Sequence, residues 1–234
     1  MAKRGLSKHL KRIAVSKAIP IIDKKGSTWM IRPNPGPHSK KYSMPMAVLL
    51  RDVLGVAKTS AEAKKILSQK LVTVDGKVRK ELKFPVGLMD VVSFAKIDKH
   101  YRLFVDWKGR LSPKEISKEE ASSKILRVTG KTTVKGGKIS LSFHDGKTMV
   151  ADNNVRVGDS VIVSLPKAQI KKHLKRDKGS RCLVWEGKHV GSVVTLKEII
   201  ERKGGKPSEA LVNQKEGDFI TIANYLFVVD DSVK

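Results

Sequence analysis

The sequence predicts a multi-domain α+β protein, strand-rich after its first 94 residues, that binds a polyanion. Three observations lead to this prediction. The 234 residues are 40% hydrophobic, which is enough for two or three small cores. Residues 59–78 combine a capped helix with a tight hairpin, whereas most later apolar runs are short and bounded by turn residues, as is typical of strands. The formal net charge of +25 calls for a polyanionic partner, and nucleic acid is the commonest.

Composition narrows the kind of nucleic acid and the compartment. Only 5% of the residues are aromatic, so the chain is poorly equipped to stack many unpaired bases, and a reader of RNA shape and phosphates fits better. The single cysteine, Cys182, excludes an internal disulfide and suits a reducing compartment. The apolar run 18–22 is short and ends at Asp23, unlike a secretory signal, and no run approaches the length of a membrane span.

The basic residues are unevenly distributed. Residues 1–94 carry a net charge of +14 and residues 95–178 carry +11, whereas residues 179–234 balance eight basic against eight acidic residues. We therefore expect attraction to RNA to come from the first three quarters of the chain. A chain ending near Lys178 is expected to remain folded and to keep most of its affinity for RNA.

Residues 1–43 are predicted to form a basic, largely extended arm. Asp23 is their only acidic residue, and the segment R-P-N-P-G-P-H at 32–38 cannot be helical, because proline fixes φ and removes a hydrogen-bond donor. The alternatives are a solvated tail and a localisation signal. In so basic a chain we favour an arm that becomes ordered on RNA.

Residues 44–94 are predicted to form the first folded domain. Apolar residues recur at helical spacing over 46–54, and Gly55 ends that helix. A second helix begins at Thr59, which forms a capping-box pattern with Glu62. Its apolar residues share one face, which leaves Lys64 and Lys65 on the outer face.

A hairpin follows the second helix. Residues 71–74 form its first strand, Asp75-Gly76 supplies the positive φ angles of a tight turn, and the return strand carries Lys77 and Arg79. Residues 84–92 then form a turn and a last strand.

These motifs resemble a known family. The hairpin V-x-V-D-G-K-V at 72–78 resembles the small RNA-binding domain of the ribosomal S4 type, which normally has Gly-Asp before its last strand; here Leu88 and Met89 intervene. G-L-M-D-V-V at 87–92, together with K-H-L-K-R at 8–12 and R-P-N-P-G-P-H, resembles the archaeal and eukaryotic small-subunit ribosomal protein family S4e. The match covers nearly the whole chain, and the short C-terminus resembles that of the archaeal members, since the eukaryotic ones carry a longer tail. The resemblance implies a structural, non-enzymatic protein of the cytoplasmic ribosome, with small-subunit rRNA and neighbouring ribosomal proteins as partners.

Residues 95–178 are predicted to form a strand-rich central domain. Strand-like runs lie at 101–105, 125–134, 139–143 and 161–163, with hairpin turns at Lys108-Gly109 and Asp145-Gly146. Basic residues gather at 167–178. This cluster is either a second phosphate-contacting patch or an ordinary solvated face, and the sequence leaves both open.

Residues 179–234 are predicted to form a small β-barrel of the KOW type. Gly179, Gly187 and Gly191 alternate with apolar pairs in that motif's spacing, since glycines permit the turns and apolar residues fill a tight barrel. Whether this barrel faces RNA or a protein neighbour is left open by its neutral charge.

No catalytic or cofactor pattern is complete. Gly130-Lys131-Thr132 and Gly146-Lys147-Thr148 each end like a phosphate-binding loop, but Ile125 and Leu141 stand where the first glycine is required. We interpret both as turns. The six histidines and one cysteine have no metal-ligand spacing. We therefore expect no metal, cofactor, small-molecule substrate or membrane contact. The rival interpretations are an RNA-modification enzyme or accessory protein using the same domain, and a free transcription or translation factor with a KOW barrel.

The residues expected to contact RNA are basic side chains of the arm, the first domain and the second patch. They are Lys3, Arg4, Lys8, His9, Lys11, Arg12, Lys17, Arg32, Lys40, Lys41, Lys58, Lys64, Lys65, Lys77, Arg79, Lys171, Lys172, Lys175 and Arg176. Their expected role is to neutralise phosphates and fix register, which carries little base information.

Overall fold

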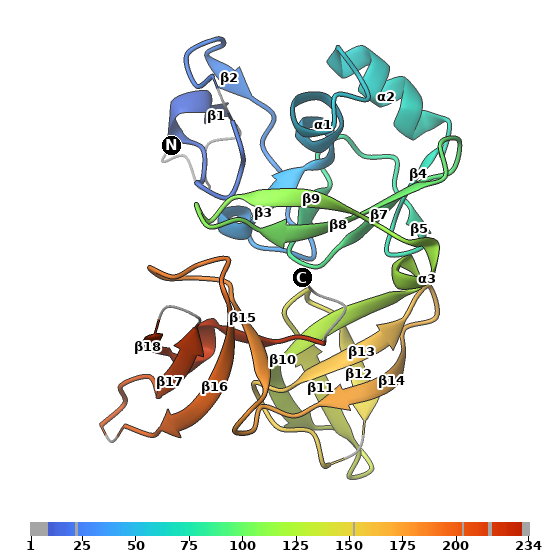
Figure 1. Ribbon diagram of the computed structural model, residues 1–234. Coiled ribbons are helices and arrows are strands. Elements are labelled where there is room, and N and C mark those ends of the chain that lie inside the picture. Colours follow the sequence, from blue (N-terminus) through green and yellow to red (C-terminus); the bar gives the residue numbers. More distant parts are fainter. Residues whose placement is uncertain (1–8, 22, 152, 203, 215–216, 231–234) are drawn as a thin grey trace, which may run out of the picture.

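The computed structural model describes residues 9–21, 23–151, 153–202, 204–214 and 217–230 (Figure 1). Three five-stranded antiparallel sheets and two two-stranded pairs make up this part of the chain. In the view of Figure 1 the N-terminal segment and the first sheet lie in the upper half, and the second and third sheets lie side by side below them. The fold is therefore the multi-unit, mostly β architecture that the sequence predicts.

The N-terminal segment folds back onto the first sheet and is not an extended arm. Its elements are β1 (Leu10–Lys11), η1 (Arg12–Ala14), β2 (Trp29–Met30) and η2 (Lys40–Tyr42). Strands β1 and β2 pair with each other, and Leu111 donates its backbone N–H to the carbonyl of Ala18 at 2.7 Å. Six of its apolar side chains are buried in the first core: Leu10, Val15, Ala18, Ile19, Ile21 and Met30. Burial of these side chains outweighs the solvation of the lysines between them, which remain at the surface.

The first folded unit is larger than predicted. Its elements are β3 (Ser43–Pro45), α1 (Met46–Val48), the π-helical turn η3 (Leu49–Val53), α2 (Ser60–Ser68), β4 (Val72–Val74), β5 (Lys77–Val78), β6 (Pro85–Gly87), β7 (Val91–Phe94), β8 (Lys99–Val105) and β9 (Leu111–Ile116). The sheet order is β5-β4-β7-β8-β9. The sheet thus crosses the predicted boundary after residue 94. The physical reason is that Leu103 and Leu111 are needed to complete the core under α2.

Helix α2 has the predicted cap and the predicted faces. The hydroxyl of Thr59 accepts a hydrogen bond from the N–H of Glu62 at 3.2 Å, and the Glu62 carboxylate accepts one from the N–H of Lys58 at 2.7 Å. Ala63 and Leu67 are fully buried. This packing leaves Lys64 and Lys65 exposed and fixes the direction in which they point.

The hairpin between β4 and β5 also has the predicted turn. Asp75 has φ of 51° and Gly76 has φ of 73°, the pair of positive angles that a tight two-residue hairpin needs. A Cβ on Gly76 would lie 2.8 Å from Pro166 of the central unit. The tip of this hairpin is therefore packed against another unit and does not project into solvent.

The central unit contains α3 (Lys118–Ala121), β10 (Ser123–Thr133), β11 (Ile139–Phe143), β12 (Thr148–Ala151), β13 (Ser160–Ser164) and β14 (Gln169–Leu174), in the sheet order β12-β11-β10-β13-β14. Gly146 has φ of 73° and lies in a turn, as predicted. Gly130, by contrast, lies inside β10, and its interpretation as a turn is wrong. The register of β10 against β11 shifts between Val128 and Gly130, so this glycine lies at an irregularity in a continuing strand.

The C-terminal unit contains β15 (Arg181–Val184), β16 (Val193–Ile200), β17 (Glu209–Gln214), β18 (Gly217–Ile222), η4 (Ala223–Tyr225) and β19 (Leu226–Val228), in the sheet order β18-β17-β16-β15-β19. It has an apolar core of its own. It also shares a second cluster with the other units, which contains Leu88, Met89, Phe104, Ile125, Leu183, Phe227 and Val229. The C-terminal sheet is therefore packed against the rest of the molecule and is not an independent appendage.

A buried group of charges, here called the ion cluster, joins the first unit to the central unit. It consists of Asp75, Asp90, Lys124, Asp145 and Lys147. The Lys124 side chain is 1% exposed, and its ammonium lies 2.7 Å from Asp75, 2.6 Å from Asp90 and 3.2 Å from Asp145. Lys147 lies 2.9 Å from Asp75 and 3.0 Å from Asp145. The turn aspartate of the hairpin thus anchors two domains to each other.

The ion cluster extends to the proline-rich segment through His38. The imidazole Nε2 lies 2.9 Å from Asp90, which also accepts the N–H of Gly87 at 2.9 Å. A Cβ on Gly87 would lie 2.4 Å from the His38 ring, so only glycine fits there. Burial alone would raise the pKa of Asp90, but its contacts with His38 and with the Lys124 ammonium hold it well below its usual range. The motifs R-P-N-P-G-P-H and G-L-M-D are therefore two halves of one packing contact.

Candidate nucleic-acid interface

Helix α2 and the adjoining hairpin present the lysines that the sequence assigned to RNA. Lys58, Lys64, Lys65 and Lys77 are all exposed. Because the opposite face of α2 is packed in the core, Lys64 and Lys65 project from a rigid element rather than from a loose tail. Arg79 is different: its guanidinium is half-buried and lies 4.4 Å from the centre of the Phe84 ring. We infer that Arg79 mainly packs against that ring.

Some basic residues of the N-terminal segment are exposed, and others bond to neighbouring side chains of the protein. His9, Lys11, Lys17 and Lys40 are exposed, and the His9 ring lies 5.4 Å from that of Trp29. Arg12 donates to the hydroxyl of Ser27 at 3.0 Å, and Lys41 pairs with Glu186 of the C-terminal unit at 2.9 Å. Arg32 is half-buried beside the proline-rich segment. Lys3, Arg4 and Lys8 lie outside the described residues.

The second predicted patch is only partly available for RNA. Lys171 and Lys175 are exposed, and Lys172 lies 3.6 Å from Asp230. Arg176 is half-buried, and its guanidinium lies over Gly158, where a Cβ would approach it to 2.5 Å. Burial, together with the nearby positive charge of Arg176, lowers the pKa of Arg127 to about 10. Arg176 therefore belongs to the junction between units more than to an outer phosphate site.

The structure adds two basic residues that are absent from the predicted RNA contacts. Lys131 and Arg156 join Lys175 and Arg176 around a cavity of about 860 Å³ between the central and C-terminal units. The backbone N–H groups of Arg156 and Arg176 both donate to Asp159, at 2.9 and 3.0 Å, which fixes the rim of the cavity. These residues are up to 45 positions apart, so no local charge pattern could have revealed the group.

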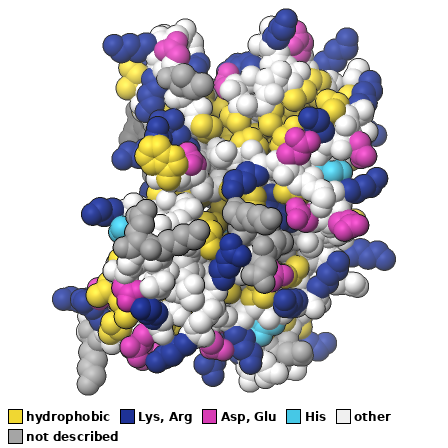
Figure 2. Space-filling view, viewed as in Figure 1, with side chains coloured by type: hydrophobic (Ala, Val, Ile, Leu, Met, Phe, Trp, Pro, Cys, Tyr) yellow, Lys and Arg dark blue, Asp and Glu magenta, His cyan; other side chains and the backbone are white. Residues whose placement is uncertain are grey.

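The positive charge is spread over the molecule. Figure 2 shows Lys and Arg side chains on every part of the visible face, with fewer Asp and Glu side chains among them. Among the described residues there is no group of three or more side chains suited to holding a metal ion, and no helix there is long and apolar enough to cross a membrane. The arrangement is suited to binding phosphates at several separate points.

Three family models match consecutive parts of the chain. The RS4NT domain matches residues 4–41, the S4 domain matches residues 47–92, and Ribosomal family S4e matches residues 97–170. The S4 match covers α1, α2 and the hairpin, which carry the exposed lysines described above. The fold and surface thus define a multi-domain, mostly β protein of the ribosomal type, built around an S4 domain.

Comparison with individual proteins identifies the family. The chain is 41% identical to small ribosomal subunit protein eS4 of Methanosphaera stadtmanae, over 98% of this chain and 95% of that protein. It is 43% identical to the eS4 protein of Pyrobaculum aerophilum, over 94% of each chain. The crystal structure of 30S ribosomal protein S4e from Thermoplasma acidophilum matches with a TM-score of 0.70 and 35% identity, over 80% of this chain and 95% of that chain. The chain belongs to the eS4 family of small ribosomal subunit proteins.

Proposed function

We propose that this protein is a structural component of the small ribosomal subunit that binds small-subunit rRNA and supports translation without catalysing a reaction. The observation that carries the proposal is the exposed lysine face of α2, held rigid by the burial of Ala63 and Leu67 on the opposite face. Lysines on a fixed element neutralise phosphates and set the register of a duplex. The net charge of +25 supplies the long-range attraction.

The same proposal assigns roles to the other units. The N-terminal segment and the exposed lysines of β14 (Gln169–Leu174) extend the rRNA contact. The C-terminal unit is a KOW-type small barrel that contacts a neighbouring ribosomal protein; its support is the five-stranded sheet, its glycine-rich turns and its neutral charge. The protein acts in the cytoplasm, where it needs no cofactor or small-molecule substrate.

Sedimentation of a cell lysate tests this function directly. A structural component remains with small subunits after a high-salt wash, because its contacts are buried within the particle. A free translation factor or an RNA-modification accessory protein is released by the wash. Recovery of the protein only in the released fraction would refute the proposal, whereas crosslinks from Lys64 or Lys65 to small-subunit rRNA would locate the contact.

A further inference from the structure

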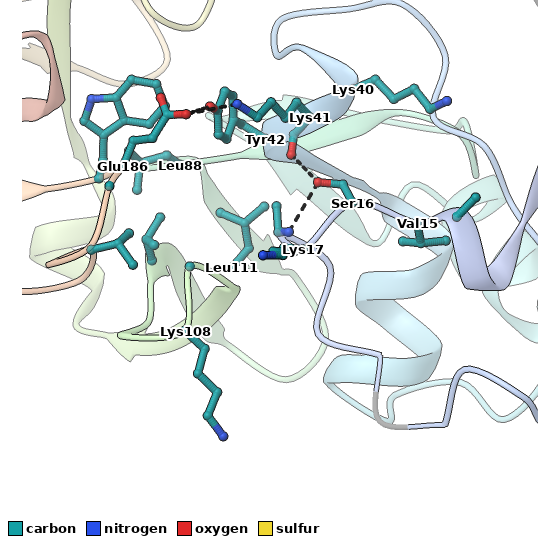
Figure 3. Close-up of a pocket in the computed structure, with 17 residues that line it drawn as sticks. Val15, Ser16, Lys17, Lys40, Lys41, Tyr42, Leu88, Lys108, Leu111 and Glu186 are labelled. Atoms are coloured by element: carbon teal, nitrogen blue, oxygen red, sulfur yellow. Dashed lines mark hydrogen bonds and ion pairs between the residues drawn. The ribbon is translucent and has the colours of Figure 1, made fainter.

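A cavity of about 750 Å³ opens where the N-terminal segment, the first sheet and the C-terminal unit meet (Figure 3). Apolar side chains from the first unit line it: Leu88, Val105 and Leu111. Leu88 and Leu111 are themselves almost fully buried, so these walls belong to the packed interior. The cavity is thus a formed feature with a rigid apolar lining, and none of the RNA contacts proposed above uses that lining.

Two aromatic residues from distant parts of the chain add an aromatic wall. The rings of Tyr42 and Trp185 meet edge to face, with centroids 4.9 Å apart. The Trp185 indole N–H donates to the carbonyl of Asn224 at 3.0 Å, which fixes the orientation of the ring. Fixed aromatic and apolar surfaces of this kind are what unpaired bases bind against.

The rim of the cavity is cationic. Lys17, Lys40 and Lys108 are exposed around it, and Figure 3 shows Lys40 and Lys108 projecting outward on different sides. Glu186, the one carboxylate in the lining, is engaged by Lys41 and by the Tyr42 hydroxyl. Burial alone would raise the pKa of Glu186, but the hydrogen bonds that its carboxylate accepts from those two groups outweigh burial and lower the pKa, so the carboxylate stays ionised and paired. A ligand that covers this mouth therefore meets surplus positive charge.

We propose that this cavity receives a single unpaired base extruded from bound RNA, while the lysines of the rim hold the phosphates on either side of it. The proposal rests on the proposed RNA-binding function and adds one specific contact to a protein that otherwise reads phosphates. A base has the flat apolar faces that suit Trp185 and the leucines, and its flanking phosphates suit the rim. A side chain from a neighbouring protein would use the apolar wall but would leave three exposed lysines without anionic partners.

The test uses synthetic RNA hairpins that differ only by one bulged adenosine. The full-length protein is expected to bind the bulged hairpin at least about tenfold more tightly than the fully paired one, a difference of about 1.4 kcal/mol. Ala14→Phe places a ring in the cavity from an exposed position of its lining, and should remove this preference while leaving affinity for the paired hairpin unchanged. Ile13→Phe is the matched control, because Ile13 is 71% exposed and does not line the cavity.

A second measurement does not depend on the blocking variant. Trp29 and Trp107 are exposed, so both can be replaced with Phe without opening the core, and Trp185 is then the only tryptophan. The bulged hairpin should quench Trp185 emission, and the paired hairpin should not. Two results would overturn the base site while leaving RNA binding itself intact. One is equal affinity for the two hairpins, and the other is an equal preference for the bulged hairpin in Ala14→Phe and Ile13→Phe. Failure to bind either hairpin would instead count against the proposed function.

Discussion

Lys124 shows how much one side chain can contribute to holding this molecule together. Burial alone would lower the pKa of its ammonium. The negative charges of Asp90, Asp75 and Asp145 outweigh burial and raise the pKa, so the ammonium stays charged. Removing one charge from a buried ion pair leaves the opposite charge buried without a partner. This lowers the free energy of unfolding far more than the loss of a surface pair. The ion cluster is therefore the most sensitive point of the interface between the first and central units.

At the residue scale, we first predict that Lys124→Met lowers the free energy of unfolding by about 3 kcal/mol. Three carboxylates would lose their central cation, of which Asp90 and Asp145 are buried, and Lys147 and His38 would remain beside them. Urea denaturation at pH 7 measures the effect. The control is Lys118→Met, since the Lys118 side chain is 79% exposed and its change should stay within about 0.5 kcal/mol. A loss below about 1 kcal/mol for Lys124→Met would show that the cluster contributes little to stability.

A second residue-scale prediction concerns acid stability. Burial and the positive charge of Lys124 lower the pKa of His144 to about 3, so the folded protein keeps this ring neutral. The ring accepts from the N–H of Arg127 at 3.2 Å and donates to the carbonyl of Leu88, also at 3.2 Å. An unfolded chain protonates histidine below pH about 6.5. The contribution of the neutral His144 ring to the free energy of unfolding is therefore fully present above about pH 6.5, and it is lost as the pH falls towards 3.

Between pH 7 and pH 5, we expect the free energy of unfolding to fall by about 1–2 kcal/mol more in the wild-type protein than in His144→Gln. Glutamine retains a donor and an acceptor but does not titrate. Denaturation at several pH values gives the comparison. Parallel pH profiles for the two proteins would contradict the assignment.

At the scale of elements, α2 places the residues that stabilise its fold on one face and the lysines proposed to bind RNA on the other. Its cap and its apolar residues hold the helix, and its lysines take no part in the core. The N-terminal segment behaves differently: it alternates buried apolar side chains with exposed lysines, so its folding and the RNA contact proposed for it are linked. Mutations that report on RNA binding alone are therefore best placed on α2.

We predict that Lys64→Glu combined with Lys65→Glu weakens binding to a small-subunit rRNA fragment at least about tenfold, or 1.4 kcal/mol, while thermal stability changes little. Two charges that we propose bind phosphates become repulsive, and the buried face is untouched. Fluorescence titration measures affinity, and calorimetry measures stability. The matched control is Lys188→Glu with Lys206→Glu, which makes the same charge change at exposed sites of the C-terminal unit. Equal losses in both pairs would show that net charge, rather than α2, governs binding.

At the scale of the whole molecule, binding should depend steeply on salt. Each neutralised phosphate contributes roughly 0.7–0.9 to the slope of log affinity against log salt, so about six contacts give a slope near −4 to −5. Titrations at a series of salt concentrations provide the slope. A slope shallower than about −2 would show that phosphates do not dominate the contact.

The packing of the C-terminal unit reverses the expectation for a shortened chain. A chain ending near Lys178 would lose Leu183, Phe227 and Val229 from the cluster they share with the other units. Each buried apolar side chain contributes roughly 1.5–3 kcal/mol, and the total approaches the stability of an ordinary domain. We predict that this truncation unfolds non-cooperatively or aggregates. Cooperative unfolding at the full-length temperature would show that the shared cluster is dispensable.

The sequence by itself determined the local elements and the class of partner. The cap at Thr59, the two faces of α2 and the Asp75-Gly76 turn depend on neighbours within a few positions, and the charge excess requires no geometry. Only the tertiary structure decided that the turn aspartate reaches Lys124, that the proline-rich segment places His38 against Asp90, and that Tyr42 meets Trp185. Those contacts join residues from 49 to 143 positions apart. Charge and hydropathy patterns carry no signal over such separations, because the packing of whole sheets brings these side chains together.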